Sequence, residues 1–283
     1  MIFYKEDYSS DYMKLQLERF ADQIDNQIQN RMMIDVMLKY SELSKKFETK
    51  NRLLAKAEDR LYKDNKVLEQ MVNMKVKEIS EAQIATIFAL VKLAESRDDD
   101  TGTHIERTSK LCRLMAEELS KLPEYKEIIT ENYIENIYKA SPLHDIGKVG
   151  IPDSILLKPG KLTYEEFEIM KTHTTIGYNT LSEVNKRYES NGFITTGMEI
   201  AKYHHEKWDG TGYPQGLSGE QIPVSARIMA LVDVYVALRS KRVYNDAFTH
   251  EKACEIIKEG RGRHFDPVIV DVFLEDHEKF RNI

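Results

Sequence analysis

Glycine and proline are absent from the first hundred residues, and this distribution constrains the fold more than any other feature of the sequence. All 13 glycines of the 283-residue chain lie at or after Gly102, and all seven prolines lie at or after Pro123. Because these residues interrupt helices and form turns, the first part can form long helices and the rest is cut into short segments. We therefore predict an N-terminal helical region over residues 1–80 and a second domain over residues 81–283.

The second domain carries apolar residues at helical spacing from about Ile84 onwards, including Ile87, Phe88 and Val91. No segment of the chain alternates convincingly between apolar and polar residues, as a half-buried strand would. The sequence therefore predicts an all-α fold. In the second domain, helices are expected over 104–120, 126–142, 163–185, 194–206, 222–240, 249–259 and 267–281.

A seven-residue repeat runs through the N-terminal region. One stripe is formed by Met33, Tyr40, Phe47, Leu54, Leu61 and Leu68, and its companion by Val36, Leu43, Lys50, Ala57, Asp64 and Met71. The period is typical of a coiled coil, but charged residues interrupt the companion stripe at Lys50 and Asp64. Two interpretations stay open: a helix that dimerises or transmits a signal, and a helix that packs on its own domain or within an N-terminal bundle.

Composition and charge exclude several classes of protein. With 41% apolar and 31% charged residues, the chain can bury a sizeable core. Lys and Arg total 41 against 47 Asp and Glu, a net charge of −6, which argues against DNA binding through a general positive field. No apolar run reaches the roughly 18 residues that span a bilayer, and no secretory signal is visible. We expect a cytoplasmic protein without a DNA or membrane partner.

Histidines and carboxylates suited to metal binding recur along the second domain. Five of the eight histidines lie between positions 104 and 205. Each histidine taken alone has an ordinary structural explanation. Burying so many ionisable groups from separate segments, however, is costly without a compensating cation. The candidate residues are His104, which follows the acidic run 98–100, and His144, Asp145, His173, His204, His205 and Asp233.

The type of ligand indicates the kind of metal. The two cysteines, Cys112 and Cys254, lie far apart in the sequence, which argues against a disulfide scaffold and a thiolate metal site. The donors are then nitrogen and oxygen only, and they outnumber what one tetrahedral ion uses, which favours two or three six-coordinate iron or manganese ions. In the pair His144-Asp145, the carboxylate can bridge two ions that hold a hydroxide. If this stretch is an α-helix, Lys148 shares a face with His144 and places a cation beside the same cavity.

A glycine-rich loop over residues 208–216 begins three residues after His205, where it can border the metal cavity. Three glycines and Pro214 permit a tight, stiff conformation. For Trp208 we expect a packing role. Tyr213 either stacks on the base of a ligand or packs the loop onto the body of the domain.

Three long motifs stand in a characteristic order: HDIGK at 144–148, GIPDSILLKPGKLT at 150–163 and HHEKWDGTGYPQGLSGEQIP at 204–223. Shorter pieces are ESRDDDTGTH at 95–104, MKTH at 170–173, ARIMALVDVYVAL at 226–238 and HFDP at 264–267. Together they resemble the HD-GYP family, a subgroup of the HD-domain metal-dependent phosphohydrolases. The resemblance extends from about Ile84 to the C-terminus.

The resemblance implies a helical HD core with two or three bound ions, usually iron or manganese. It also implies hydrolysis of the bacterial signalling molecule cyclic di-GMP to pGpG, GMP or both. Asp145 and Lys148 would act in catalysis, and Lys148 and Arg242 would contact phosphate, with Tyr213 as a further candidate for substrate binding. The implied metal ligands are His104, His144, Asp145, His173, His204, His205 and Asp233, with Asp100 as the acidic ligand found in family members with three metals.

Two positions depart from the family pattern. Val236 replaces a second aspartate, which removes a potential partner for a metal ligand. Asn245 replaces a lysine, which removes a positive charge expected near the dianionic substrate; such a contact is typically worth about 1.5–3 kcal/mol.

The leading hypothesis is a metal-dependent cyclic di-GMP phosphodiesterase in which a metal-bridging hydroxide attacks the phosphodiester. The departures at Val236 and Asn245 motivate an alternative, a cyclic di-GMP receptor or scaffold with little activity. A third hypothesis is an HD-type hydrolase of another nucleotide. The N-terminal helix would provide a homodimer contact or a site for a signalling partner.

Overall fold

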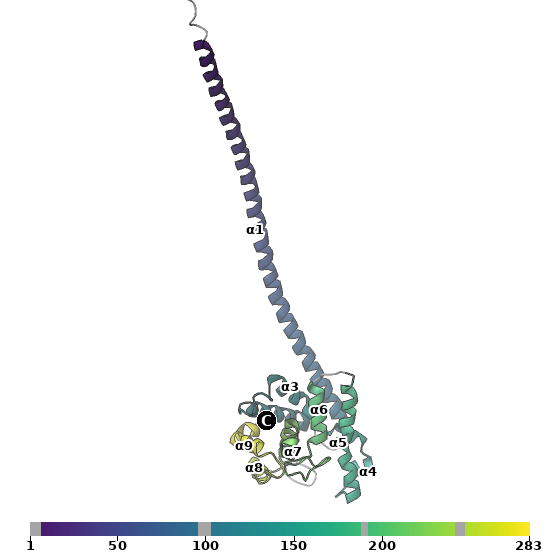
Figure 1. The fold of residues 1–283 in the computed structure, drawn as a ribbon. Coiled ribbons are helices and arrows are strands. Elements are labelled where there is room, and N and C mark those ends of the chain that lie inside the picture. The colour runs from purple at the N-terminus through teal and green to yellow at the C-terminus, as the bar shows by residue number, and fades with distance from the viewer. Residues whose placement is uncertain (1–6, 96–102, 188–191, 241–246) are drawn as a thin grey trace, which may run out of the picture. The chain divides into compact units, whose positions relative to one another are not determined.

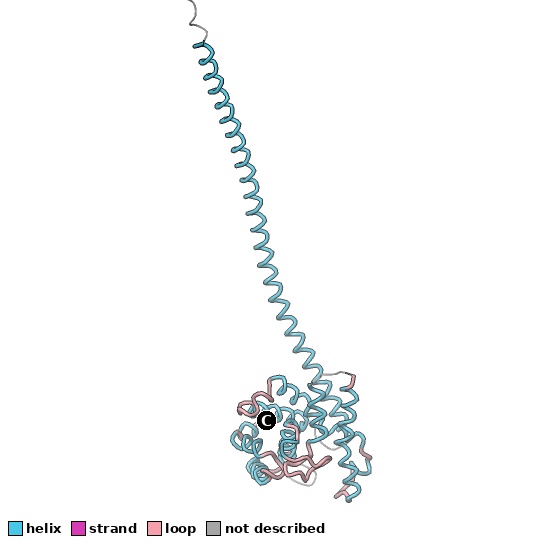
Figure 2. Tube along the Cα trace, viewed as in Figure 1, coloured by secondary structure: helices cyan, strands magenta, loops and turns pink. Residues whose placement is uncertain are grey.

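The computed structural model describes residues 7–95, 103–187, 192–240 and 247–283. Within these ranges the regular elements are helices, and no strand forms beyond two isolated backbone bridges (Figure 2). The predicted all-α fold is confirmed. The chain divides into two compact units, Met1–Glu78 and Ile79–Ile283.

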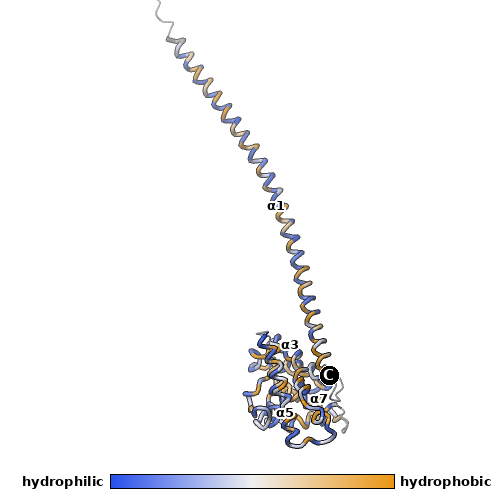
Figure 3. Tube along the Cα trace, turned by 90° about the vertical axis from the view of Figure 1, so that its right-hand side faces the viewer, coloured by the Kyte–Doolittle hydropathy of each residue, from blue (hydrophilic) through white to orange (hydrophobic). Residues whose placement is uncertain are grey.

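Helix α1 (Asp7–Glu95) is one uninterrupted helix of 89 residues, as the absence of glycine and proline from this segment predicts (Figure 1). It is the only helix among the described residues of the first unit, so no bundle forms there. Apolar and polar residues are interspersed along its whole length (Figure 3). Ion pairs one turn apart, such as Lys46–Glu42 and Lys63–Asp59, support the exposed helix.

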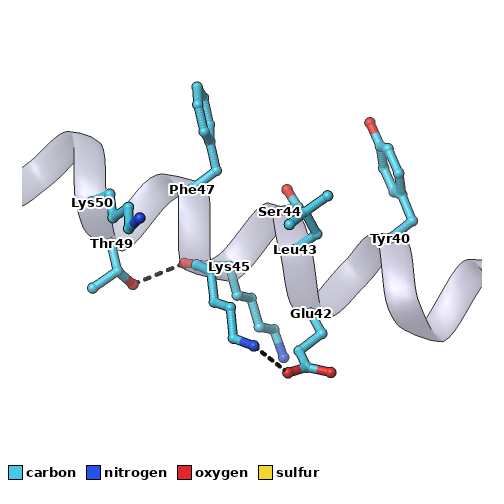
Figure 4. A pocket seen from close by; sticks show the side chains of 9 residues that line it. Tyr40, Glu42, Leu43, Ser44, Lys45, Phe47, Thr49 and Lys50 are labelled. Atoms are coloured by element: carbon cyan, nitrogen blue, oxygen red, sulfur yellow. Dashed lines mark hydrogen bonds and ion pairs between the residues drawn. The ribbon is translucent and has the colours of Figure 1, made fainter.

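The seven-residue stripe of α1 is exposed to solvent. Tyr40 and Phe47 project from the same side of the helix, and Glu42 projects from the other (Figure 4). Tyr40 is 74% exposed and Leu61 is 62% exposed. All residues that line the pocket in Figure 4 lie between Tyr40 and Lys50 of this one helix. The pocket is therefore an open stretch of helix surface and not an enclosed site.

The second unit contains short helices joined by turns, close to the predicted segments. They are α2 (Thr103–Leu119), α3 (Glu131–Ala140), the 3-10 helix η1 (Ser141–Gly150), α4 (Asp153–Leu156), α5 (Tyr164–Asn185), α6 (Gly192–Tyr203), the 3-10 helix η2 (Gly219–Gln221), α7 (Val224–Arg239), α8 (His250–Glu259), α9 (Pro267–Glu275) and α10 (His277–Arg281).

Side-chain caps set several of these boundaries. Thr163 and Glu166 form a reciprocal capping box at the start of α5. Thr130 caps α3, so this helix begins at Glu131, five residues after the predicted start at residue 126. The predicted helix 267–281 is interrupted at Asp276, which separates α9 from α10. This break places His277 at the start of a new helix.

Helix α7 is the centre of the core and is buried over most of its surface. Ile228, Met229, Leu231, Val232 and Val236 are all at most 1% exposed. They pack with apolar residues of α2, α3, α8 and α9 in one cluster. A helix buried on nearly all sides is held rigidly, so α7 provides a fixed support for any functional residue it carries. No helix in the described ranges is long and apolar enough to cross a membrane.

Candidate metal centre

The predicted ligands in the described residues come together from five helical segments. In one group, donor atoms of Asp145, His173, His204 and His205 lie within 4.8 Å of one another, and so do those of His104, His144 and Asp233 in a second group. The ligands come from α2, η1, α5, α7, and α6 with the turn that follows it. The predicted convergence of these segments is therefore present in the structure.

Close backbone packing brings η1 against α5. A Cβ atom added to Gly147 would lie 1.9 Å from the carbonyl oxygen of His173, so no larger residue fits at this position. The glycine of the HDIGK motif thus allows the segment with His144 and Asp145 to approach the helix that carries His173.

The helix type corrects one detail of the sequence interpretation. Residues 141–150 form a 3-10 helix, in which residues three apart share a face. Lys148 is therefore aligned with Asp145, not with His144, and its Nζ lies 2.7 Å from Asp145 Oδ2. The ammonium group of Lys148 still lies beside the cluster, where it pairs with the carboxylate of Asp145.

Three of the histidines are oriented by the backbone. The Nδ1 atoms of His144, His173 and His204 lie 2.9, 2.8 and 2.9 Å from the carbonyl oxygens of Ser141, Met170 and Ile200. Because a carbonyl only accepts hydrogen bonds, each Nδ1 carries the proton and each Nε2 presents a lone pair. The local helix thus fixes the tautomer that a metal ligand requires.

These lone pairs point at Asp145 and Asp233 without hydrogen bonding to them. His173 Nε2 and His204 Nε2 lie 3.3 and 3.7 Å from Asp145 Oδ1. His144 Nε2 lies 3.4 Å from Asp145 Oδ2 and 3.9 Å from Asp233 Oδ1. Two donors at about 2.1 Å from one six-coordinate ion are about 3 Å apart, so the two shortest separations, 3.3 and 3.4 Å, are within about half an ångström of this value. Asp145 faces ligands of both groups, as a bridging carboxylate does.

Buried donors without partners test whether the residues suit a cation. Among the described residues, the Nε2 atoms of His144, His173 and His204 and Oδ1 of Asp145 are buried and make no hydrogen bond. Unsatisfied buried polar atoms are costly, and four of them directed at one another are not explained by packing. A divalent cation satisfies all of them, so the donor set fits a metal.

Electrostatics favour the protonation states that metal binding needs. Burial lowers the pKa of His173 to about 4 and lowers the pKa of His144 and His205, so these imidazoles are neutral at pH 7. Burial alone would raise the pKa of Asp145, but the surrounding positive charge, that of Lys148 first, outweighs burial and holds the pKa of this carboxyl well below its usual range. The centre combines neutral nitrogen donors with an ionised carboxylate.

The glycine-rich loop borders the cluster, as predicted. The rings of Tyr213 and His205 stack with their centroids 4.8 Å apart. The loop is held by Glu206, which is 1% exposed and accepts hydrogen bonds from the backbone N–H groups of Gln215 and Leu217 at 2.7 and 3.1 Å. Sequence reasoning missed Glu206, although its position directly after His205 could have drawn attention to it.

Five further residues named from the sequence lie outside the described residues or outside the histidine cluster. Asp100, Arg242 and Asn245 lie outside the described residues. Val236, the departure on α7, is fully buried within the apolar core. Trp208 has its ring 5.7 Å from the guanidinium of Arg227, in keeping with the expected packing role.

Comparisons with known proteins give consistent results. A family model described as HD domain matches residues 66–269. The chain is 54% identical over 203 residues to a "Cyclic di-GMP phosphodiesterase" of Vibrio cholerae. The aligned region covers 72% of this chain and 41% of that protein. It is 46% identical over 229 residues to a "Probable cyclic di-GMP phosphodiesterase" of the same organism, spanning 81% of this chain and 52% of that protein.

A third relative carries a different substrate in its name. It is the "3'3'-cGAMP-specific phosphodiesterase 2" of Vibrio cholerae, 39% identical over 209 residues, spanning 74% of this chain and 37% of that protein. The chain thus covers about half the length, or less, of the curated relatives described above. The predicted resemblance is confirmed by the family match and by these relatives.

Proposed function

The chain belongs to the HD-domain family, and from this premise we propose that it is a metal-dependent phosphodiesterase that hydrolyses cyclic di-GMP to pGpG, GMP or both. The observation that carries the proposal is the set of buried, unpaired donors on His144, Asp145, His173 and His204. The names of the two relatives at 54% and 46% identity support the choice of substrate. We expect this activity to reside in residues 81–283, with residues 1–80 as a regulatory helical module in the cytoplasm.

Divalent ions, with iron and manganese favoured by the nitrogen and oxygen donors, are proposed to be held by two neighbouring ligand groups; Asp145 belongs to the first group, and its Oδ2 lies 3.4 Å from His144 Nε2 of the second. When bound, such ions polarise the phosphoryl oxygens and lower the pKa of water. The groups are Asp145, His173, His204 and His205, and His104, His144 and Asp233. Asp100 remains a proposed ligand of a third ion.

Other side chains are proposed to bind and orient the substrate. Lys148 Nζ, held 2.7 Å from Asp145 Oδ2, places a positive charge beside the centre, where it would offset the negative charge that grows on the phosphodiester during hydrolysis. Tyr213 stacks on His205 and is partly exposed, so we propose that it stacks on a guanine base. Arg242 remains a proposed phosphate contact.

The test is a product assay with matched metal analysis. Protein purified anaerobically and supplied with iron or manganese is incubated with cyclic di-GMP, and the nucleotides are separated by chromatography. We expect linear pGpG or GMP, and metal bound at two or more ions per chain. Tight binding of cyclic di-GMP without product would instead support the receptor alternative.

A second substrate has a specific observation in its favour, since a relative at 39% identity is named for 3'3'-cGAMP. The two dinucleotides share the phosphodiester ring and differ in one base. Running both substrates at equal concentration in the same assay separates the candidates through the ratio of their kcat/KM values. A ratio that favours 3'3'-cGAMP would overturn the choice of cyclic di-GMP.

We propose further that α1 pairs with a second copy of the chain through the seven-residue stripe. Met33, Phe47 and Leu54 of this stripe are 58–65% exposed. An apolar stripe of this period is buried when two helices supercoil. The test is light scattering on the full chain and on the variant Phe47→Asp/Leu54→Asp, with Lys45→Asp, an exposed position on the side of the helix away from the stripe, as the control. We expect a dimer that the double substitution converts to a monomer; a monomeric wild-type chain would exclude the pairing.

A further inference from the structure

A second cluster of metal-binding residue types lies apart from the centre described above. It consists of His250 and Cys254, one turn apart on α8, and His277 at the start of α10. One potential ligand atom from each lies within 4.8 Å of the other two. The proposed phosphodiesterase activity uses none of these residues.

The distances within the cluster suit a tetrahedral ion. Cys254 Sγ lies 3.5 Å from His250 Nε2, and His250 Nε2 lies 2.9 Å from His277 Nδ1. Around zinc, with bonds of about 2.1 Å to nitrogen and 2.3 Å to sulfur, a nitrogen and a sulfur are about 3.6 Å apart and two nitrogens about 3.4 Å apart. The sulfur is already at this separation from His250, and a shift of about half an ångström in the His277 ring would bring the two nitrogens to theirs.

His250 is oriented by a side chain on the core helix. It is 3% exposed, and its Nδ1 lies 2.8 Å from the hydroxyl oxygen of Tyr235 on α7. The same hydroxyl lies within hydrogen-bonding reach of the Phe280 carbonyl oxygen, at 3.5 Å. If the hydroxyl donates to the carbonyl, it accepts from Nδ1–H, which leaves the Nε2 lone pair directed at Cys254 and His277. This is the arrangement that orients histidines in metal sites.

A fourth donor is close to the three. Glu278 Oε1 lies 3.5 Å from His277 Nδ1, and its side chain is 60% exposed. His277 is partly exposed, so an ion can enter from solvent and either this carboxylate or water can take the fourth position. A set of one thiolate, two imidazoles and one oxygen is typical of zinc and unlike the nitrogen and oxygen donors of the phosphodiesterase centre.

We propose that His250, Cys254 and His277 bind a zinc ion that fastens α10 to α8, separately from the ions of the phosphodiesterase centre. The wide separation of the two cysteines in the sequence predicted no thiolate metal site. The proposed site departs from that prediction because Cys254 needs no second cysteine: the break at Asp276 places a histidine near it. A structural ion here would stabilise the C-terminal end of the domain.

Cobalt spectroscopy on the full chain tests the proposal. Cobalt bound through a thiolate gives an intense charge-transfer band in the near ultraviolet, and cobalt in the phosphodiesterase centre, which contains no sulfur, does not. We expect the band in the wild-type protein, its loss in Cys254→Ser and its retention in Cys112→Ser, the matched control at the other cysteine. Bound zinc should fall by one ion per chain in Cys254→Ser alone.

The result does not depend on activity, so failure of the proposed function would leave it intact. Absence of the band from the wild-type protein, or its persistence in Cys254→Ser, would overturn the proposal and leave the cluster as a hydrogen-bonded network. If Cys254→Ser does not fold, alkylation of the wild-type protein decides: zinc should slow iodoacetamide modification of Cys254, mapped by mass spectrometry. An unchanged rate at Cys254 would also overturn the proposal.

Discussion

The two histidine clusters of the second unit are built in different ways. Around Asp145, three imidazoles are each held by a backbone carbonyl, and their outward nitrogens are buried without partners. Around Cys254, one imidazole is held by the side chain of Tyr235, and its outward nitrogen already contacts His277. These donors of the first cluster have no hydrogen-bond partners among the described residues of the protein, whereas those of the second bond in part to one another.

This difference separates the expected roles. A set of unsatisfied donors stays in place only if a rigid core holds it, and burial of α7 and the packing of η1 on α5 supply that support. Such preorganised donors suit chemistry at the ion. A cluster whose donors bond to one another can exist with or without metal, which suits an ion that adds stability. Substitutions in the two clusters should therefore affect different measurements.

Asp145→Asn should have the largest effect. The substitution keeps the shape of the side chain but removes the charge that faces both ligand groups, so metal binding and activity should fall together, with kcat/KM reduced by about 1,000-fold or more. Metal content and phosphodiesterase rate measure the effect. Asp271→Asn, which removes the carboxylate of an exposed pair with Arg261, is the matched control. Full metal content in Asp145→Asn would contradict the proposed bridging role.

Lys148→Met should act on rate more than on metal content. Its ammonium group lies 2.7 Å from Asp145 Oδ2 and is placed to offset charge on the substrate. Loss of one such contact typically lowers kcat by about 100-fold. The control is Lys110→Met, which removes a lysine paired with Glu106 one turn away on α2. Equal losses of activity and of metal would show that Lys148 instead serves to keep Asp145 in place.

The contrast between the clusters also explains what could be predicted from the sequence. The absence of glycine and proline before Gly102 predicted α1, and helical spacing predicted the main helices of the second unit. The proposed ligand residues were recognisable because so many histidines and carboxylates are unusual together. Residues that act through geometry were not: Glu206 supports a loop from a distance of about ten residues, and His277 reaches Cys254 only because α9 and α10 separate at Asp276. Such contacts depend on tertiary packing, which local spacing does not encode.

Glu206→Gln should reduce activity less than the two substitutions above, and it should act only at the Asp145 cluster. The carboxylate accepts two backbone hydrogen bonds from the loop, and an amide presents one oxygen and one NH₂ group, so one bond is lost. A hydrogen bond to a charged group is typically worth about 1.5–3 kcal/mol. We expect Tyr213 to lose its fixed position and KM to rise by about tenfold. Glu220→Gln, at an exposed site in η2, is the control. An unchanged KM would indicate that Tyr213 does not contact the substrate.

Tyr235→Phe should have the smallest effect on activity and should separate the clusters most cleanly. The hydroxyl is lost, so His250 Nδ1 is left without this hydrogen bond in a buried position. Removing the group that orients a metal-bound histidine typically weakens metal binding about 10- to 100-fold. We expect the increase in Tm on adding zinc to be smaller than in the wild-type protein, and kcat/KM to stay within about twofold because the Asp145 cluster has its own backbone supports. Tyr125→Phe, a buried tyrosine that belongs to neither cluster, should lower Tm without changing that increment. Loss of activity in Tyr235→Phe would show that α7 couples the two clusters, and they would then have to be treated as one functional unit.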